Sequence, residues 1–89
     1  MNFIHSDLGI LPARSVVVVV LDTAANVKLL DEVNFSAYQR GQNHHFYGGQ
    51  AVRSPVRLSV PDSRHWHLTL DLGGASGNIR YSIRVVKRH

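Results

Sequence analysis

Two of the six histidines in this 89-residue sequence are spaced to share one face of a β-strand. His65 and His67 lie two residues apart, and Asp71 follows four residues after His67. Alternate residues of a strand point to the same side of a sheet, so all three side chains would face one way. Two imidazoles and a carboxylate are ligands that zinc, manganese and iron accept. The spacing therefore indicates a candidate metal site.

The residues between the histidines argue against that interpretation. Cupins, which are double-sheet jelly rolls, carry a His-x-His pair and a following Glu that point into the barrel. Here Trp66, Leu68 and Leu70 take the inward positions, so the histidines would face outward. An exposed pair without supporting hydrogen-bond partners binds metal poorly. A cupin-like metal-dependent protein using these three ligands is kept as an alternative, and we expect no bound cofactor.

A second group of candidate residues lies mid-chain, where aromatic side chains flank two adjacent histidines and a Gly-Gly pair. Aromatic rings with polar neighbours on a loop could stack on a sugar or a base. The alternative is that they only close the end of the fold. The candidate ligand-binding residues are Tyr38, His44, His45, Phe46 and Tyr47.

Basic residues gather toward the end of the chain. The formal net charge is +4, and no acidic residue follows Asp71. Such a segment can attract an anionic partner such as nucleic acid. The simpler interpretation is that the charge keeps the chain soluble, because no nucleic-acid-binding motif is present. The residues of this second alternative are Arg80, Arg84, Lys87 and Arg88.

Other catalytic signals are missing from the sequence. There is no cysteine, which excludes a cysteine nucleophile, and no Gly-x-Ser-x-Gly motif occurs. The glycine-rich segment 73–77 lacks the Lys-Ser/Thr ending of a phosphate loop and precedes a strand, which favours a hairpin turn. We therefore expect a non-catalytic recognition module that binds a small ligand or a protein partner through loops at one end.

Period-two and β-branched segments, separated by turn residues, predict an all-β fold, a small antiparallel β-sandwich of jelly-roll-like character. One short helix or helical turn is expected near residues 31–40, closing an end of the sandwich. Pro55 cannot donate to a sheet ladder, so it is expected at an edge or where the chain changes strand partner. The expected strands are 15–22, 25–31, 44–47, 50–60, 65–72 and 79–86.

Two hairpins are predicted. A turn at Thr23-Ala24 would return the valine-rich strand onto 25–31, and the glycine loop would join the last two strands. In that second hairpin, inward residues meet inward residues when Asp71 lies opposite Arg80 and His67 lies opposite Arg84.

The length predicts a single domain over residues 1–89. The longest apolar run, Val16–Leu21, is far shorter than the about twenty residues that cross a membrane, and the first residues do not resemble a signal peptide. Because the chain also lacks cysteine, a cytoplasmic location is expected. The N-terminal strand and the Pro55 segment are expected edges that could pair two copies as a homodimer.

Short motifs carry a family resemblance: HSDLG at 5–9, ANVKLLD at 25–31, NF at 34–35, YGG at 47–49, SPV at 54–56 and HWHLTLDLGG at 65–74. They resemble a bacterial family of domains of unknown function, found as short stand-alone proteins or beside TIR-like domains. One departure is Arg14-Ser15, where Gly-Asp is expected before the valine strand. The resemblance covers nearly the whole chain. It implies a compact β-sandwich and, for TIR-linked members, a sensing or recognition role, with no activity or site residues assigned.

Overall fold

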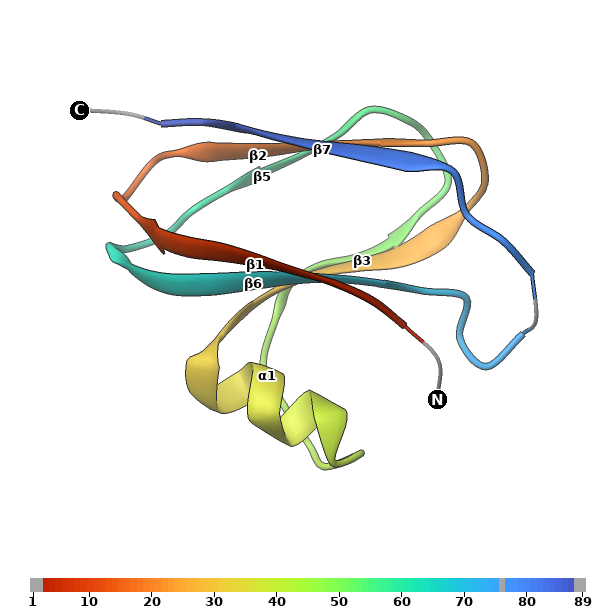
Figure 1. The fold of residues 1–89 in the computed structure, drawn as a ribbon, viewed down its shortest axis with the longest axis horizontal. Coiled ribbons are helices and arrows are strands. Elements are labelled where there is room, and N and C mark those ends of the chain that lie inside the picture. The colour runs from red at the N-terminus through yellow and green to blue at the C-terminus, as the bar shows by residue number, and fades with distance from the viewer. Residues whose placement is uncertain (1–2, 76, 88–89) are drawn as a thin grey trace.

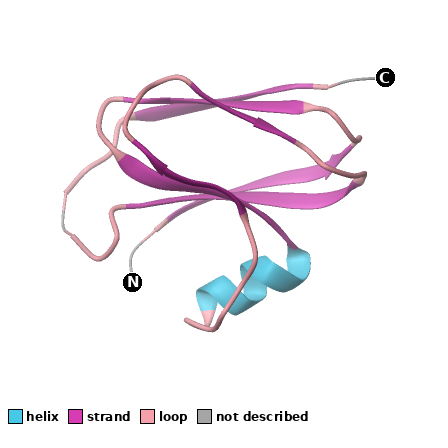
Figure 2. Ribbon diagram, turned by 180° about the vertical axis from the view of Figure 1, so that it is seen from behind, coloured by secondary structure: helices cyan, strands magenta, loops and turns pink. Residues whose placement is uncertain are grey.

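The chain forms two antiparallel β-sheets packed face to face, with one helix on the outer side of the larger sheet (Figures 1 and 2). The computed structural model describes residues 3–75 and 77–87. The four-stranded sheet has the order β1-β6-β3-β4, and the three-stranded sheet has the order β5-β2-β7. This confirms the predicted small all-β sandwich with one short helix. The elements are β1 Ile4–Leu11, β2 Val16–Leu21, β3 Ala25–Asp31, α1 Glu32–Gln39, β4 Tyr47–Ala51, β5 Val56–Ser59, β6 Arg64–Asp71 and β7 Tyr81–Val86.

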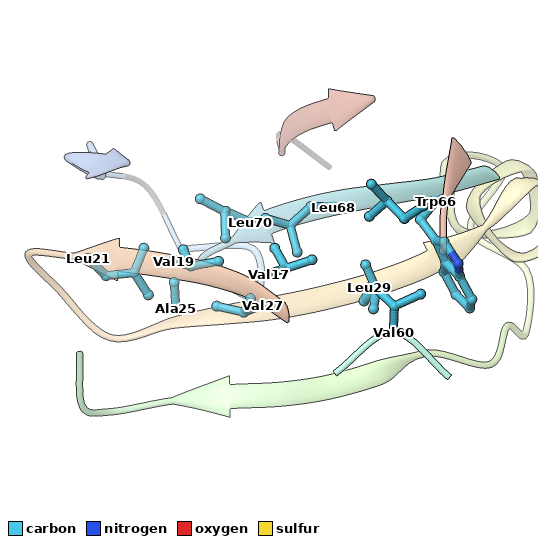
Figure 3. Close-up of a cluster of buried hydrophobic side chains, with 11 residues drawn as sticks. Val17, Val19, Leu21, Ala25, Val27, Leu29, Val60, Trp66, Leu68 and Leu70 are labelled. Atoms are coloured by element: carbon cyan, nitrogen blue, oxygen red, sulfur yellow. The ribbon is translucent and has the colours of Figure 1, made fainter. Parts of the chain in front are cut away.

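The core lies between the two sheets (Figure 3). The predicted facing of β6 is confirmed, because Trp66, Leu68 and Leu70 are buried in this core. Val17 and Val19 of β2 meet them from the opposite sheet, where their branched side chains suit a pleated surface. The alternation of β6 therefore leaves its polar residues on the outer face of the four-stranded sheet.

Both predicted hairpins are wrong. β2 pairs with β5 and β7, whereas β3 pairs with β4 and β6, so the turn after β2 carries the chain from one sheet to the other. The glycine loop likewise crosses between sheets, and β7 does not pair with β6. Arg84 lies opposite Val18, not His67, and the backbone N–H of Arg80 donates to Asp22, not to Asp71. The inward alternation is the same in both sheets, so it identifies the core face but not the strand partner.

The segment around Gly48 and Gly49 also differs from the prediction. The glycines were expected to end a strand at 44–47, but both lie inside β4. Pro55 precedes β5, an outer strand of the smaller sheet, at the point where the chain changes sheets, as predicted. β1 is an outer strand of the larger sheet, as predicted, while the homodimer itself stays a prediction.

Helix α1 begins at a capped residue. The Asp31 carboxylate accepts a hydrogen bond from the backbone N–H of Asn34 at 2.9 Å, which satisfies one of the free donors of the first turn. Phe35 and Tyr38 are the buried residues of the helix and pack with Leu30. The helix was predicted at the end of the sandwich, but it covers the outer face of the four-stranded sheet (Figure 1). No helix in the described part of the chain is long and apolar enough to cross a membrane.

Replacing Asp31 with alanine should lower the free energy of unfolding by about 1 kcal/mol, because the N-cap acceptor is lost. Asp62→Ala is the matched control, since both carboxylates pair with Arg64 but only Asp31 caps the helix. Urea denaturation of the two variants checks the prediction. An Asp62→Ala loss as large as that of Asp31→Ala would assign the effect to the Arg64 ion pair and contradict the capping role.

Candidate functional site

The outer face of the four-stranded sheet carries a row of polar side chains beneath α1. In the pairing of β1 with β6, Asp7 lies opposite His67 and His5 lies opposite Thr69. In the pairing of β3 with β6, Lys28 lies on the other side of Thr69. Residues opposite one another in an antiparallel pair share a face. Three strands that are distant in sequence therefore bring their polar side chains to one surface.

At one end of this face, two carboxylates and two imidazoles meet; we call Asp7, Glu32, His65 and His67 the histidine cluster. His65 Nε2 lies 2.6 Å from Asp7 Oδ1. Glu32 Oε1 lies 2.5 Å from His67 Nε2 and 3.4 Å from His65 Nε2. One ligand atom from each of Asp7, His65 and His67 falls within 4.8 Å of the others. Glu32 comes from the first turn of α1, so the cluster unites β1, β6 and the helix.

His67 is the buried member of the histidine cluster. Its side chain is 5% exposed, against 37% for His65. The ring stacks on Phe35 at 4.3 Å between centroids, and its Nδ1 lies 2.8 Å from His5 Nε2. The histidines were expected to be exposed and without supporting partners; they do face away from the core, but α1 covers His67 and His5 supports it. Burial and the neighbouring His67 lower the pKa of His5.

The electrostatics of the exposed edge favour the charged form of Asp7. The pKa of Asp7 is lowered, first by a hydrogen bond from the Gly9 backbone N–H and then by one from His65. Asp7 is thus an ionised acceptor at neutral pH and faces His65 from the adjacent strand.

Asp71 does not belong to the histidine cluster, which corrects the predicted ligand set. Four residues along a strand correspond to about 13 Å, too far for a shared ion. Its carboxylate instead accepts hydrogen bonds from the Tyr38 hydroxyl at 2.5 Å, the Asn26 amide at 2.8 Å and the Gly73 backbone N–H at 2.9 Å. Burial opposes its ionisation, but these three donors outweigh burial and keep the pKa of Asp71 below 3.8. Burial and this carboxylate together raise the pKa of Tyr38.

At the other end of α1 lies an open cleft of about 460 Å³, which we call the lysine cleft. The Lys28 ammonium sits 5.0 Å from the Tyr38 ring centroid and 4.6 Å from that of Phe46. His44 Nε2 is 3.2 Å from Lys28 Nζ. The cleft is lined by Lys28, Tyr38, Gly41, Gln42, Asn43, His44 and Phe46.

Three of the five predicted ligand-binding residues therefore meet in one place: Tyr38, His44 and Phe46. The other two lie elsewhere. Tyr47 packs edge-on against Trp66, with ring centroids 6.0 Å apart, and the His45 backbone N–H donates to Asn34. Along residues 44–47, His44 and Phe46 therefore line the lysine cleft, whereas His45 and Tyr47 make their contacts elsewhere.

Three important residues were not predicted as site residues, and each had a usable signal. Asp7 has the same parity as His5 on the N-terminal strand, and Lys28 is the polar residue between inward-facing Val27 and Leu29. Glu32 follows the helix cap, where an acidic first turn is common. The alternation identified their faces, but it did not show that β1, β3 and α1 are neighbours around β6.

The basic residues of the nucleic-acid alternative lie apart from this face. Arg84 is an exposed residue of β7, in the smaller sheet, and Arg80 and Lys87 flank that strand as exposed residues. Arg88 lies outside the described residues. In the described part of the chain, this charge therefore lies along an outer strand of the smaller sheet, away from the histidine cluster and the lysine cleft.

The family assignment comes from comparison with known sequences. The model of a family described as a domain of unknown function (DUF1883) matches residues 1–89. The chain belongs to the DUF1883 family. This confirms the predicted membership of a family of unknown function, while the bacterial origin and the TIR association of DUF1883 domains stay predictions. Neither a curated protein nor a solved structure shows a significant match to this DUF1883 chain.

Proposed function

We propose that this DUF1883 domain is a non-catalytic recognition module that binds a small anionic ligand carrying a planar ring. The observation that supports it is the lysine cleft, where a cation is held beside aromatic rings and is reached through an open surface. Phe46 is 40% exposed, so one face of an aromatic ring is available for stacking. Lys28 would contact the anionic group of the ligand.

The charge of Lys28 is available for such a ligand. In the described residues, the carboxylate ion pairs involve Arg64, His65 and His67, and none involves Lys28. Asp71 lies close enough for Lys28 to contribute to lowering its pKa, but the Asp71 oxygens are taken by Tyr38, Asn26 and the Gly73 amide. The net charge of +4 adds a weak, salt-sensitive attraction for anions.

His44 supports a binding role over a catalytic one. Its Nδ1 lies 2.9 Å from the Gln42 carbonyl oxygen, which only accepts, so Nδ1 carries the proton. The remaining nitrogen, Nε2, then accepts from the Lys28 ammonium. Both nitrogens are engaged, and the ring serves to orient Lys28 and not to take a proton from a substrate.

The test is titration with AMP, adenosine and inorganic phosphate, followed by calorimetry and NMR. AMP should bind more tightly than adenosine or phosphate alone, because it has both a ring and an anionic group. Phe46→Ala should weaken AMP binding at least about fivefold through lost stacking, and Lys28→Gln should weaken it by about three- to fivefold. Lys87→Gln, which removes an exposed lysine outside the cleft, is the control.

Two results would overturn this function. One is the absence of AMP binding at millimolar concentration, and the other is equal weakening by Lys28→Gln and Lys87→Gln, which would reduce the effect to net charge. The cytoplasmic location and the link to TIR-like domains are carried forward as predictions and rest on the sequence.

A further inference from the structure

The histidine cluster has the donor set of a transition-metal site. It supplies two imidazole nitrogens and two carboxylate groups from β1, α1 and β6. Zn²⁺ accepts this mixture of nitrogen and oxygen ligands, whereas Ca²⁺ and Mg²⁺ prefer oxygen alone. The two carboxylates would also balance the charge of a divalent cation. The ligand chemistry therefore selects the class of metal.

His67 is held in place before any ligand arrives. Its ring stacks with both Phe35 and His65, at 4.3 and 4.8 Å between centroids, and its side chain is almost fully buried. When Nε2 faces a metal, Nδ1 carries the proton and donates to His5 Nε2, 2.8 Å away. A hydrogen bond to the second ring nitrogen of a ligating histidine is the usual way to fix its tautomer and orientation.

The distances in the cluster are close to those that a metal requires. Neighbouring ligand atoms around tetrahedral Zn²⁺ are about 3.3 Å apart, given metal–ligand distances near 2.0 Å. Three separations between a histidine nitrogen and a carboxylate oxygen are 2.5, 2.6 and 3.4 Å, and one ligand atom from each of Asp7, His65 and His67 lies within 4.8 Å of the others. Asp7 and Glu32 are 54% and 60% exposed. The Glu32 carboxylate can therefore swing outward by the small amount needed, while the Gly9 backbone N–H holds Asp7 Oδ1 and His67 stays fixed. The same exposure gives the ion a path from solvent.

We propose that Asp7, Glu32, His65 and His67 bind one divalent transition-metal ion of the zinc class, with His5 as a positioning residue. This site is independent of the lysine cleft, since the two share no residue. The competing explanation is a set of hydrogen bonds between histidines and carboxylates that holds β1 and α1 on β6 without metal.

The experiment uses untagged protein stripped with EDTA and titrated with Zn²⁺, with calorimetry for stoichiometry and Co²⁺ absorption for geometry. We expect one ion per chain and intense visible bands typical of tetrahedral Co²⁺. The Tm should rise by about 14 °C when free Zn²⁺ is at one hundred times Kd. His65→Ala and Glu32→Gln should each weaken Zn²⁺ binding at least about tenfold, and His5→Ala by about 10- to 100-fold.

The control is His45→Ala, which removes an exposed histidine outside the cluster. Because His67 is buried, its replacement could disturb the fold, so the exposed ligands His65 and Glu32 carry the test. Binding that is absent, not stoichiometric, or weakened equally by His45→Ala overturns the site and leaves the hydrogen-bonded cluster. AMP binding is measured in a separate experiment, so the failure of the metal site would leave the proposed function of the lysine cleft intact, and the reverse.

Discussion

Replacing Asp71 with alanine is expected to lower the free energy of unfolding by about 3 kcal/mol. The substitution leaves three donors without their acceptor, and the Tyr38 hydroxyl loses its partner in a buried environment. Each unsatisfied buried donor costs about 1–3 kcal/mol, reduced here where water can reach the site. Tyr38 ties α1 to the sheet through this bond, so the helix should lose order first. Urea denaturation and amide exchange across α1 measure both effects.

The same carboxylate predicts a pH dependence. The pKa of Asp71 is lower in the folded chain than in the unfolded chain, where it is near 3.8. Its stabilisation is therefore complete above about pH 5 and is lost as the pH falls through 3.8 toward the lower folded-state value. The difference in unfolding free energy between the wild type and Asp71→Asn should shrink between pH 5 and acid pH. A constant difference over this range would contradict an ionised Asp71.

The sequence predicted correctly which side of strand β6 faces the core. The alternation of Trp66, Leu68 and Leu70 correctly placed His65 and His67 on the outer side of β6, because period-two patterning follows directly from strand geometry. The valine-rich strand and the helix after Asp31 were also found, since β-branched residues favour strands and Asp31 is a typical N-cap.

Neighbours across the fold were not predictable in the same way. Hydrophobic alternation is satisfied whether β6 pairs with β7 or with β1 and β3, since each choice buries the same residues. The site depends on that choice, because Asp7 reaches the histidines only when β1 lies beside β6. Glu32 reaches the histidines only when α1 covers the sheet, and the stacking of Phe35 of α1 on His67 holds the helix there. Arg14 stands where the family pattern suggested glycine, and its φ is 69°. The sequence showed that the residue departs from the pattern, but it did not show this backbone conformation.

Replacing Gly48 with alanine is expected to destabilise the domain by about 3 kcal/mol and to displace β4. Its φ of 114° is a conformation that L side chains rarely adopt, which costs on the order of 1–3 kcal/mol. A Cβ there would also overlap the Val27 carbonyl oxygen of β3, and overpacking of this kind costs about 1–3 kcal/mol. Gly48 lies opposite Lys28 in the β3–β4 pairing, so the strand shift should reach the lysine cleft.

Gly49→Ala separates the two causes. Gly49 has a φ of 142°, so alanine is strained there as well, but a Cβ at this position meets no atom within 4 Å. We expect Gly49→Ala to cost about 1–2 kcal/mol, from backbone strain alone, and to leave AMP binding unchanged. Gly48→Ala should cost more and weaken AMP binding, as chemical denaturation and calorimetry would show. An equal loss of unfolding free energy in the two variants would mean that β4 can shift to make room for the Cβ at no cost. The close approach to Val27 would then not be the reason that glycine is needed at position 48.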